Sequence, residues 1–261
     1  MAAAFAGRQT GRVGFGRVHL ARSGTPEAEK NDLKPWQKKQ WCIPQIGAEF
    51  VACMEDVLDL YAEPYDPAQP TVCFDETSKQ LISETRQALT ARPGQVERYD
   101  YEYERHGTRN LFMFFEPLAG QRHVQVTQQR TQQDFAHAMK WLVDEAYPDA
   151  AIIRVVLDNL NTHTVAALYE TFEATEANRI RKRLAFHHTP KHGSWLNMAE
   201  IEFSIFARQA WSDYIPDEPT LKHNVQVLEA NRNLTRATVN WCFTSQDARV
   251  KLRRLYPSIS D

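Results

Sequence analysis

The sequence has few cysteines, and those it has are far apart in the chain. Cys42, Cys53, Cys73 and Cys242 include no CxxC pair, which argues against both a structural zinc site and a disulfide framework. No apolar run approaches the roughly 20 residues that a membrane helix needs. The sequence therefore predicts a chain of the reducing cytoplasm that does not cross a membrane.

The chain also lacks a strong excess of positive charge. Its formal net charge of -2 argues weakly against a nucleic-acid partner, because domains that grip phosphates are commonly basic. Cations nevertheless gather in two runs, NRIRKRLAFHHTPKHG at 178–193 and RVKLRR at 249–254. Such runs are most often solvated helix faces. Charge alone therefore leaves a nucleic-acid partner open.

Composition and periodicity divide the 261 residues into four segments. Residues 1–30 carry Arg but little periodicity, and we expect a disordered or atypical N-terminal segment. Residues 31–70 combine a Lys- and Pro-rich linker with a helix, because Phe50, Met54, Val57 and Tyr61 recur at helical spacing. Residues 71–210 form the main domain, and residues 211–261 form a helical C-terminal extension.

The main domain alternates between strand and helix patterns. Strands are predicted at 72–77, 109–117, 122–129, 152–158 and 184–190, and the first three form an antiparallel meander. Helices are predicted at 131–148, through Leu168 and Phe172, and from about Asn197 to Gln209. This order predicts an α/β protein with a ribonuclease H-like mixed five-stranded sheet flanked by helices. In that fold the first and fourth strands are neighbours.

Three acidic residues occupy positions where a buried sheet does not favour charge. Asp75 interrupts the apolar strand VCFDET, Asp158 ends VVLD, and Glu200 lies in the first turn of a helix. Each has an ordinary structural explanation, as a turn or cap residue or as a partner of the helix dipole. Glu202 competes with Glu200, because the two point about 200° apart and only one can face the sheet. Met198, Ile201 and Ile205 are predicted to mark the apolar side of this helix.

Convergence of the three acids would require a cation. Carboxylates about 4 Å apart repel by roughly 4 kcal/mol at an effective dielectric of 20. Oxygen-only ligands select Mg²⁺ or Mn²⁺, and two such ions can clamp the attacking and leaving oxygens of a phosphoryl displacement. The predicted chemistry is therefore phosphodiester hydrolysis and strand transfer with two Mg²⁺ ions, for which Mn²⁺ can substitute.

Together, VCFDET, VVLDNLNTH and HTPKHGSWLNMAEIEF resemble the three signature blocks of mariner-superfamily transposases, in particular the bacterial insertion sequence 630 group. The resemblance covers about residues 31–257. It implies that Asp75, Asp158 and Glu200 are the catalytic, metal-binding triad. Residues implied to support the triad or to contact DNA are Asn159, His163, Lys191, Ser194, Trp195 and Asn197. From the basic run we add Arg181 and Arg183 as candidate DNA contacts.

The resemblance also implies an activity and partners. Members cut double-stranded DNA at the ends of their own element, and the freed 3′ hydroxyl attacks a target, typically at a TA dinucleotide. A homodimer in the bacterial cytoplasm, associated with the nucleoid, is expected. Upstream of NDLKPWQKKQWCIP the sequence shows no helix-turn-helix pattern, so an N-terminally truncated transposase is expected.

Other interpretations remain open at this stage. The first is a catalytically idle remnant that only binds DNA or dimerises. Another is a glycosidase that uses two of the acids, which metal dependence would distinguish. A zinc pair of His188 and His192 is disfavoured, because Pro190 and Gly193 break the helix that would place both on one face.

Overall fold

The computed structural model describes residues 47–86, 89–98, 101–211 and 214–257. The predicted N-terminal segment 1–30 and the linker up to residue 46 lie outside the described residues, and so does Cys42. Each of the elements below belongs to the described part of the chain.

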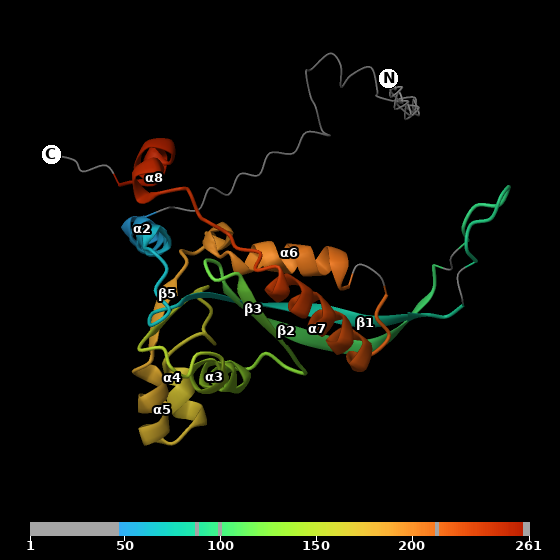
Figure 1. Ribbon diagram of the computed structural model, residues 1–261, viewed down its shortest axis with the longest axis horizontal. Helices are drawn as coiled ribbons and strands as arrows, with labels where there is room; N and C mark the ends of the chain where they lie inside the picture. The colour runs from blue at the N-terminus through green and yellow to red at the C-terminus, as the bar shows by residue number, and fades with distance from the viewer. Residues whose placement is uncertain (1–46, 87–88, 99–100, 212–213, 258–261) are drawn as a thin grey trace, which may run out of the picture. The chain divides into compact units, whose positions relative to one another are not determined.

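The centre of the protein is a five-stranded mixed sheet (Figure 1). Its strands follow the spatial order β3-β2-β1-β4-β5, with β1 antiparallel to β2, β2 antiparallel to β3, and β1, β4 and β5 parallel. This order confirms the predicted ribonuclease H-like α/β fold. The strands are β1 (Thr71–Glu84), β2 (Tyr103–Glu116), β3 (Gln121–Thr127), β4 (Ile153–Leu157) and β5 (Leu184–His188).

The sheet has a hydrophobic core on each face, so its central strands contain runs in which every residue is apolar and buried, such as residues 72–74 and 111–115. Successive side chains alternate between the faces. Cys73, Met113 and Val156 pack in one cluster, whereas Phe74 and Val155 pack in the other. We call the cluster that contains Cys73 the first core.

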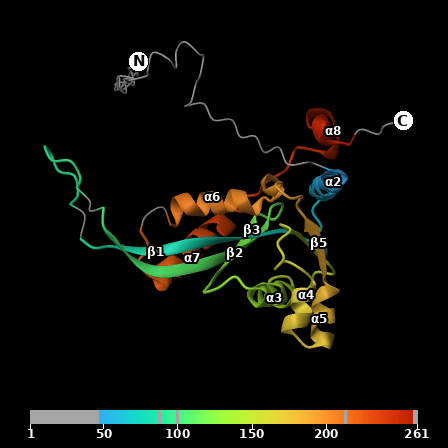
Figure 2. The same cartoon turned by 180° about the vertical axis from the view of Figure 1, so that it is seen from behind.

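Different helices cover the two faces, as Figures 1 and 2 show from opposite sides. Residues of α2, α6, α7, α8 and the 3-10 turn η2 join the first core. The second core contains residues of α3, its wider π-helical continuation η1, α4 and α5. The bounds are α2 (Ala48–Ala62), α3 (Gln132–Trp141), η1 (Leu142–Ala146), α4 (Ala166–Thr171), α5 (Ala174–Arg181), η2 (Ser194–Leu196), α6 (Ala199–Gln209), α7 (Glu218–Leu234), α8 (Ser245–Lys251) and η3 (Arg253–Leu255).

Capping boxes fix two of the helix starts. Thr131 and Asp134 form the predicted capping box at α3, where the Thr131 hydroxyl accepts from the Asp134 N–H at 3.2 Å. For α8 the sequence predicts Ser245 as the cap, and this prediction is wrong. Thr244 caps this helix instead, in a second capping box with Asp247.

The β1–β2 ribbon is longer than the sequence patterns predict. β1 continues to Glu84 and β2 begins at Tyr103, and beyond them the chain forms a narrow hairpin with bridges Leu89–Arg98 and Arg92–Gln95. The ribbon extends beyond the rest of the sheet in both views (Figures 1 and 2). Residues 101–108 are exposed, so this part of β2 lacks the apolar alternation from which strands are predicted.

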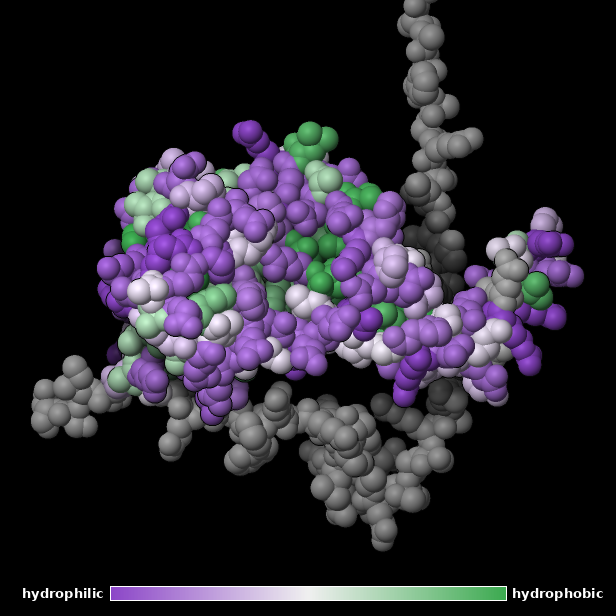
Figure 3. Space-filling model, turned by 90° about the horizontal axis from the view of Figure 1, so that it is seen from below, coloured by the Kyte–Doolittle hydropathy of each residue, from purple (hydrophilic) through white to green (hydrophobic). Residues whose placement is uncertain are grey.

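Within the described ranges, no helix is both long and apolar enough to cross a membrane. Figure 3 shows one face of the molecule, which is mainly hydrophilic with hydrophobic residues gathered in small patches.

Candidate active site

The strand register places Asp75 and Asp158 side by side. In the parallel β1–β4 pair, Thr71 lies opposite Arg154 and Cys73 lies opposite Val156. Two residues further along each strand, the same register brings Asp75 opposite Asp158. Neighbouring strands are about 4.8 Å apart, and the alternation along β1 places Asp75 on the same face as Cys73. Two acids 83 positions apart in sequence therefore meet at one edge of the sheet.

Asn197 fixes the start of the helix that carries Glu200 close to Asp75. The Asn197 side-chain amide donates to the carbonyl oxygen of Phe74 at 2.8 Å, and its oxygen accepts from the N–H of Ala199 at 3.1 Å. Asn197 is 2% exposed, so both bonds are sheltered from water. The start of α6 is thus fixed to the residue before Asp75, and Glu200 is exposed in the first turn of that helix.

The loop between β5 and α6 is held at two further points. The Tyr61 hydroxyl donates to the carbonyl oxygen of Leu196 at 2.8 Å. Gly193 packs so tightly that an added Cβ would lie 2.5 Å from Cγ of Pro190, which is closer than carbon atoms can approach. The loop therefore requires glycine at this position, and the segment before Glu200 has little freedom to move.

Asp75 holds its proton unusually tightly. Burial raises the pKa of Asp75 from 3.8 to about 7; the Glu76 N–H, which donates at 2.8 Å, opposes the rise, and the charges of Asp158 and Glu200 add to it. Burial and neighbouring negative charge both disfavour the carboxylate form. The influence of Asp158 and Glu200 on Asp75 shows that the three predicted acids share one electrostatic environment.

Asp158 is oriented by a buried histidine. Nδ1 of His163 lies 2.5 Å from Oδ1 of Asp158, and its Nε2 lies 3.5 Å from Oε2 of Glu76. The ring packs between Phe74 and Phe135, at centroid distances of 5.3 and 4.8 Å. Burial alone would lower the pKa of His163, but Asp158 and Glu76 outweigh it and raise the pKa to about 9.

These residues fit a divalent cation in donor chemistry and in backbone register. The donors are three carboxylates, which suit a hard cation, and a cation would offset both the burial that chiefly raises the pKa of Asp75 and the smaller effect of its acidic neighbours. As the side chains stand, no three His, Cys, Asp or Glu residues of the described chain are grouped closely enough to hold an ion. Because the Asp158 carboxylate is turned to His163, rotation of side chains is needed to close the site.

Glu202 faces the interior, so it is not the acid that joins Asp75. Its carboxylate is fully buried and accepts from Arg122 at 3.3 Å and from Arg232 at 2.7 and 2.8 Å. Arg122 is also fully buried and donates to the carbonyl oxygens of Gly120 and Ala237. We call Arg122, Glu202 and Arg232 the buried ion cluster.

The prediction that Ile201 marks the apolar side of α6 is wrong. Ile201 is 40% exposed and Ile205 is only partly buried, whereas Met198 is buried as predicted and Phe206 is buried as well. The physical reason is the buried ion cluster. Two guanidinium groups from β3 and α7 satisfy the Glu202 carboxylate, which allows a charged residue to occupy the inner side of α6.

The remaining predicted loop residues lie at the same edge of the sheet as the acids. Asn159 follows β4, and Lys191 and Ser194 follow β5; all three are exposed. Trp195 is 44% exposed and stacks on Trp241, with ring centroids 6.2 Å apart and planes 27° apart.

Arg181 and Arg183 lie at the opposite end of the parallel strands. Arg183 immediately precedes β5, and its guanidinium donates to the carbonyl oxygens of Tyr147 and Pro148 at 2.7 and 3.0 Å. Arg181, the last residue of α5, is exposed and bonds only to the Asn178 side chain at 3.3 Å. The five-residue strand β5 separates them from the acids by roughly 16 Å. The structure does not bring these two residues to the triad.

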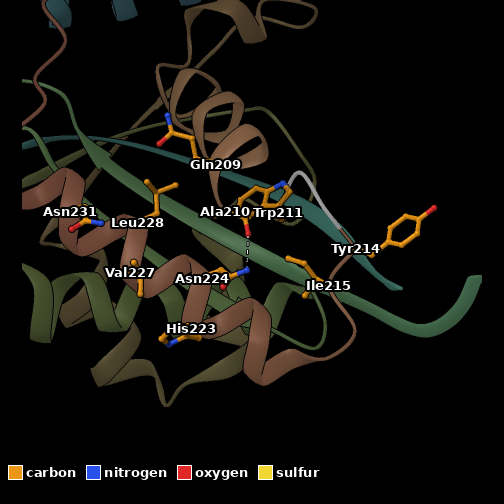
Figure 4. Close-up of a pocket in the computed structure, with 10 residues that line it drawn as sticks. All are labelled: Gln209, Ala210, Trp211, Tyr214, Ile215, His223, Asn224, Val227, Leu228 and Asn231. Atoms are coloured by element: carbon orange, nitrogen blue, oxygen red, sulfur yellow. Dashed lines mark hydrogen bonds between the residues drawn. The ribbon is translucent and has the colours of Figure 1, made fainter. Parts of the chain in front are cut away.

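A surface pocket of about 460 Å³ lies elsewhere, between the end of α6 and α7 (Figure 4). Trp211, Ile215 and Val227 are among its lining residues, and Asn224 spans the two elements by donating to the carbonyl oxygen of Ala210 at 3.0 Å. None of the predicted site residues lines it. The candidate active site, at Asp75 and the end of β4, is therefore separate from this pocket.

Two kinds of residue at the site were missed by sequence reasoning. The sequence patterns assign no role to Glu76, although its position next to Asp75 on the opposite face of the strand is a usable signal. The pairing of Arg122 and Arg232 with Glu202 had no local signal, because the three residues lie on separate elements.

Comparison with known protein families identifies the family of the main domain. Residues 70–222, more than half of the chain, match the family described as DDE superfamily endonuclease. The match contains Asp75, Asp158 and Glu200. No curated protein matches the chain in sequence.

Solved structures with a similar fold include complexes of the Mos1 transposase. The paired-end complex with the left transposon end has a TM-score of 0.51 and 12% identity, over 81% of this chain and 66% of that chain. The Mos1 mariner paired-end complex with Mn has a TM-score of 0.50 and 14% identity, over 81% and 67%. A pre-cleavage Mos1 transpososome has a TM-score of 0.50 and 13% identity, over 90% and 72%. The chain thus spans about two thirds of the Mos1 chain in the paired-end complexes, and the likeness shows the shared fold.

Proposed function

Because the chain belongs to the DDE endonuclease superfamily, we propose that it is a DNA transposase that uses Asp75, Asp158 and Glu200 as its catalytic triad. The reaction is hydrolysis of a phosphodiester bond, followed by attack of the freed 3′ hydroxyl on a second DNA. The observation that carries this proposal is the β1–β4 register, which sets Asp75 opposite Asp158 beneath the start of the helix that carries Glu200.

The protein's own groups divide the work of such a site. Asp75, Asp158 and Glu200 would bind Mg²⁺ or Mn²⁺, and these ions would supply the Lewis acidity that activates water and stabilises the leaving oxygen. His163 holds the Asp158 carboxylate at 2.5 Å and is itself held between Phe74 and Phe135. This bond restricts the orientation of the Asp158 carboxylate, and that orientation has to change for the three acids to close around a cation.

The finer features of the function rest on resemblance and on the names of similar structures. We propose the insertion sequence 630 group, double-stranded DNA ends as substrate, and a TA dinucleotide as target. The similar Mos1 complexes are named as paired-end assemblies, which supports a homodimer that holds two ends. Exposed Asn159, Lys191, Ser194 and Trp195 surround the acids and are proposed DNA contacts.

The test is nicking of supercoiled plasmid DNA by the purified chain. We expect nicking with little sequence preference in Mn²⁺, slower nicking in Mg²⁺ and none in EDTA. Asp158→Asn should abolish nicking, because an amide loses the charge that binds the cation. The matched control is Asp149→Asn, which changes an exposed acid in a turn outside the site. Equal nicking by wild type and Asp158→Asn would refute the proposed triad.

A further inference from the structure

The basic run at 249–254 folds beside the candidate active site. It forms the end of α8 and the turn η3, and Ala248 of α8 is fully buried in the first core, which also contains Leu196 of η2. Tyr256 anchors the far side of the segment by donating to Glu55 of α2 at 2.8 Å. In Figures 1 and 2, α8 lies next to α2, whereas α4 and α5 lie on the other side of the sheet.

A chain of ring contacts joins this segment to the loop before Glu200. The Lys251 ammonium lies 5.3 Å from the ring centroid of Phe243, and Phe243 meets the Trp195 ring edge to face at 6.3 Å. Trp195 in turn stacks on Trp241. The basic segment and the active-site loop therefore form one continuous surface around a partly exposed Trp195.

The cations of this surface differ in whether an acidic side chain already pairs with them. Glu55 holds Arg249 through two bonds of 2.8 Å, and Asp247 lies 3.2 Å from Lys251. Arg253 and Arg254 are exposed and make no ion pair with any residue that the structure describes. Two adjacent unpaired guanidinium groups are thus left beside the site.

The other basic run, in α5, behaves differently. Arg179 is tied to both Glu176 and Asp144 at 2.8 Å, and Lys140 bonds the same two acids. This network pairs Arg179 and Lys140 within the fold, as on a solvated helix face, whereas exposed Arg181 and Lys182 of the same run lie at the opposite end of the parallel strands from the acids. The same explanation does not account for Arg253 and Arg254.

We propose that Arg253 and Arg254 bind backbone phosphates of the DNA on one flank of the scissile bond. This inference rests on the proposed function, because it takes DNA as the partner. Guanidinium groups suit phosphate oxygens in charge and in geometry. The acids of α2 restrict where the DNA can lie, because Glu49 and Asp59 are exposed on this helix and repel phosphate. The DNA therefore passes over η3 and Trp195 rather than along α2.

The test measures the salt dependence of DNA binding by Arg253→Gln/Arg254→Gln. Each phosphate neutralised contributes about 0.9 to the slope of log K against log salt concentration. The double variant should therefore lower the magnitude of that slope by about 1.8 relative to wild type. The matched control is Arg92→Gln/Arg98→Gln, which removes two exposed cations from the hairpin beyond the β1–β2 ribbon and should leave the slope unchanged. Fluorescence anisotropy with a labelled duplex in EDTA gives the affinities without catalysis.

Three outcomes separate this inference from the proposed function. A reduced slope in the Arg253/Arg254 variant alone supports the inference, particularly if its nicking rate at saturating DNA matches wild type. Equal slopes in wild type and this variant overturn it while leaving the triad proposal intact. A wild-type chain that binds no DNA overturns both. Unchanged thermal melting of the double variant verifies that the exposed substitutions leave the fold in place.

Discussion

Glu200 and Glu202 lie two residues apart on α6, and the structure predicts opposite consequences when each is changed to Gln. Glu202→Gln removes a buried charge that two guanidinium groups contact, and Arg122 then has no counter-ion in the interior. Breaking a buried ion pair costs about 3–5 kcal/mol of stability. Because Arg232 is 19% exposed and can turn partly to water, we expect a cost at the lower end of this range. A cost of about 3 kcal/mol corresponds to roughly 6–12 °C in Tm for a domain of this size.

Glu200→Gln is the matched control on the same helix turn. Glu200 is exposed, so its change should alter the free energy of unfolding by less than about 0.5 kcal/mol. It should nevertheless abolish Mn²⁺-dependent nicking, whereas Glu202→Gln should retain nicking below its lowered melting temperature. Thermal and urea melts with plasmid nicking check both. Wild-type stability in Glu202→Gln, or full nicking by Glu200→Gln, would refute the assignment.

Two further predictions concern pH and the anchor of α6. In EDTA, the protonated form of Asp75 favours the folded state, because burial raises its pKa from 3.8 to about 7. Its contribution to the free energy of unfolding is complete below about pH 4, and up to about 4 kcal/mol of it is lost as the pH rises to about 7. His163 adds stability that is complete below pH 6.5 and is lost by about pH 9. Urea melts should show the first loss in wild type but not in Asp75→Asn; parallel pH profiles would contradict it. Asn197→Ala should cost about 1–3 kcal/mol and raise the Mn²⁺ concentration needed for nicking, because it frees α6 from Phe74, whereas exposed Asn161→Ala should do neither. An unchanged Mn²⁺ requirement in folded Asn197→Ala would show that the anchor does not position Glu200.

Sequence patterns predicted the order of the strands because both faces of the sheet bury apolar residues. The runs around Phe74, Phe112 and Val155 are long enough and apolar enough to be recognised without a structure. The strand order then predicted that Asp75 and Asp158 are neighbours, and the β1–β4 register places them so.

The interior of α6 could not be predicted in the same way. Helical spacing favoured Ile201 as an inward residue, but Glu202 is buried because Arg122 and Arg232 reach it from β3 and α7. These partners lie 80 and 30 residues from Glu202, so no local pattern reveals them. The outer half of the β1–β2 ribbon was missed for a related reason. Solvent surrounds it, so its sequence carries no apolar alternation.

The most direct test of the central claim is a crystal structure of the chain soaked with Mn²⁺, with the metal located by its anomalous scattering. The proposed triad predicts Mn²⁺ bound by carboxylate oxygens of Asp75 and Asp158 at about 2.0–2.3 Å, with Glu200 turned toward the same ion or a neighbouring one. Anomalous density only at other acids, with the Asp158 carboxylate still bonded to His163, in a preparation that nicks DNA, would contradict it.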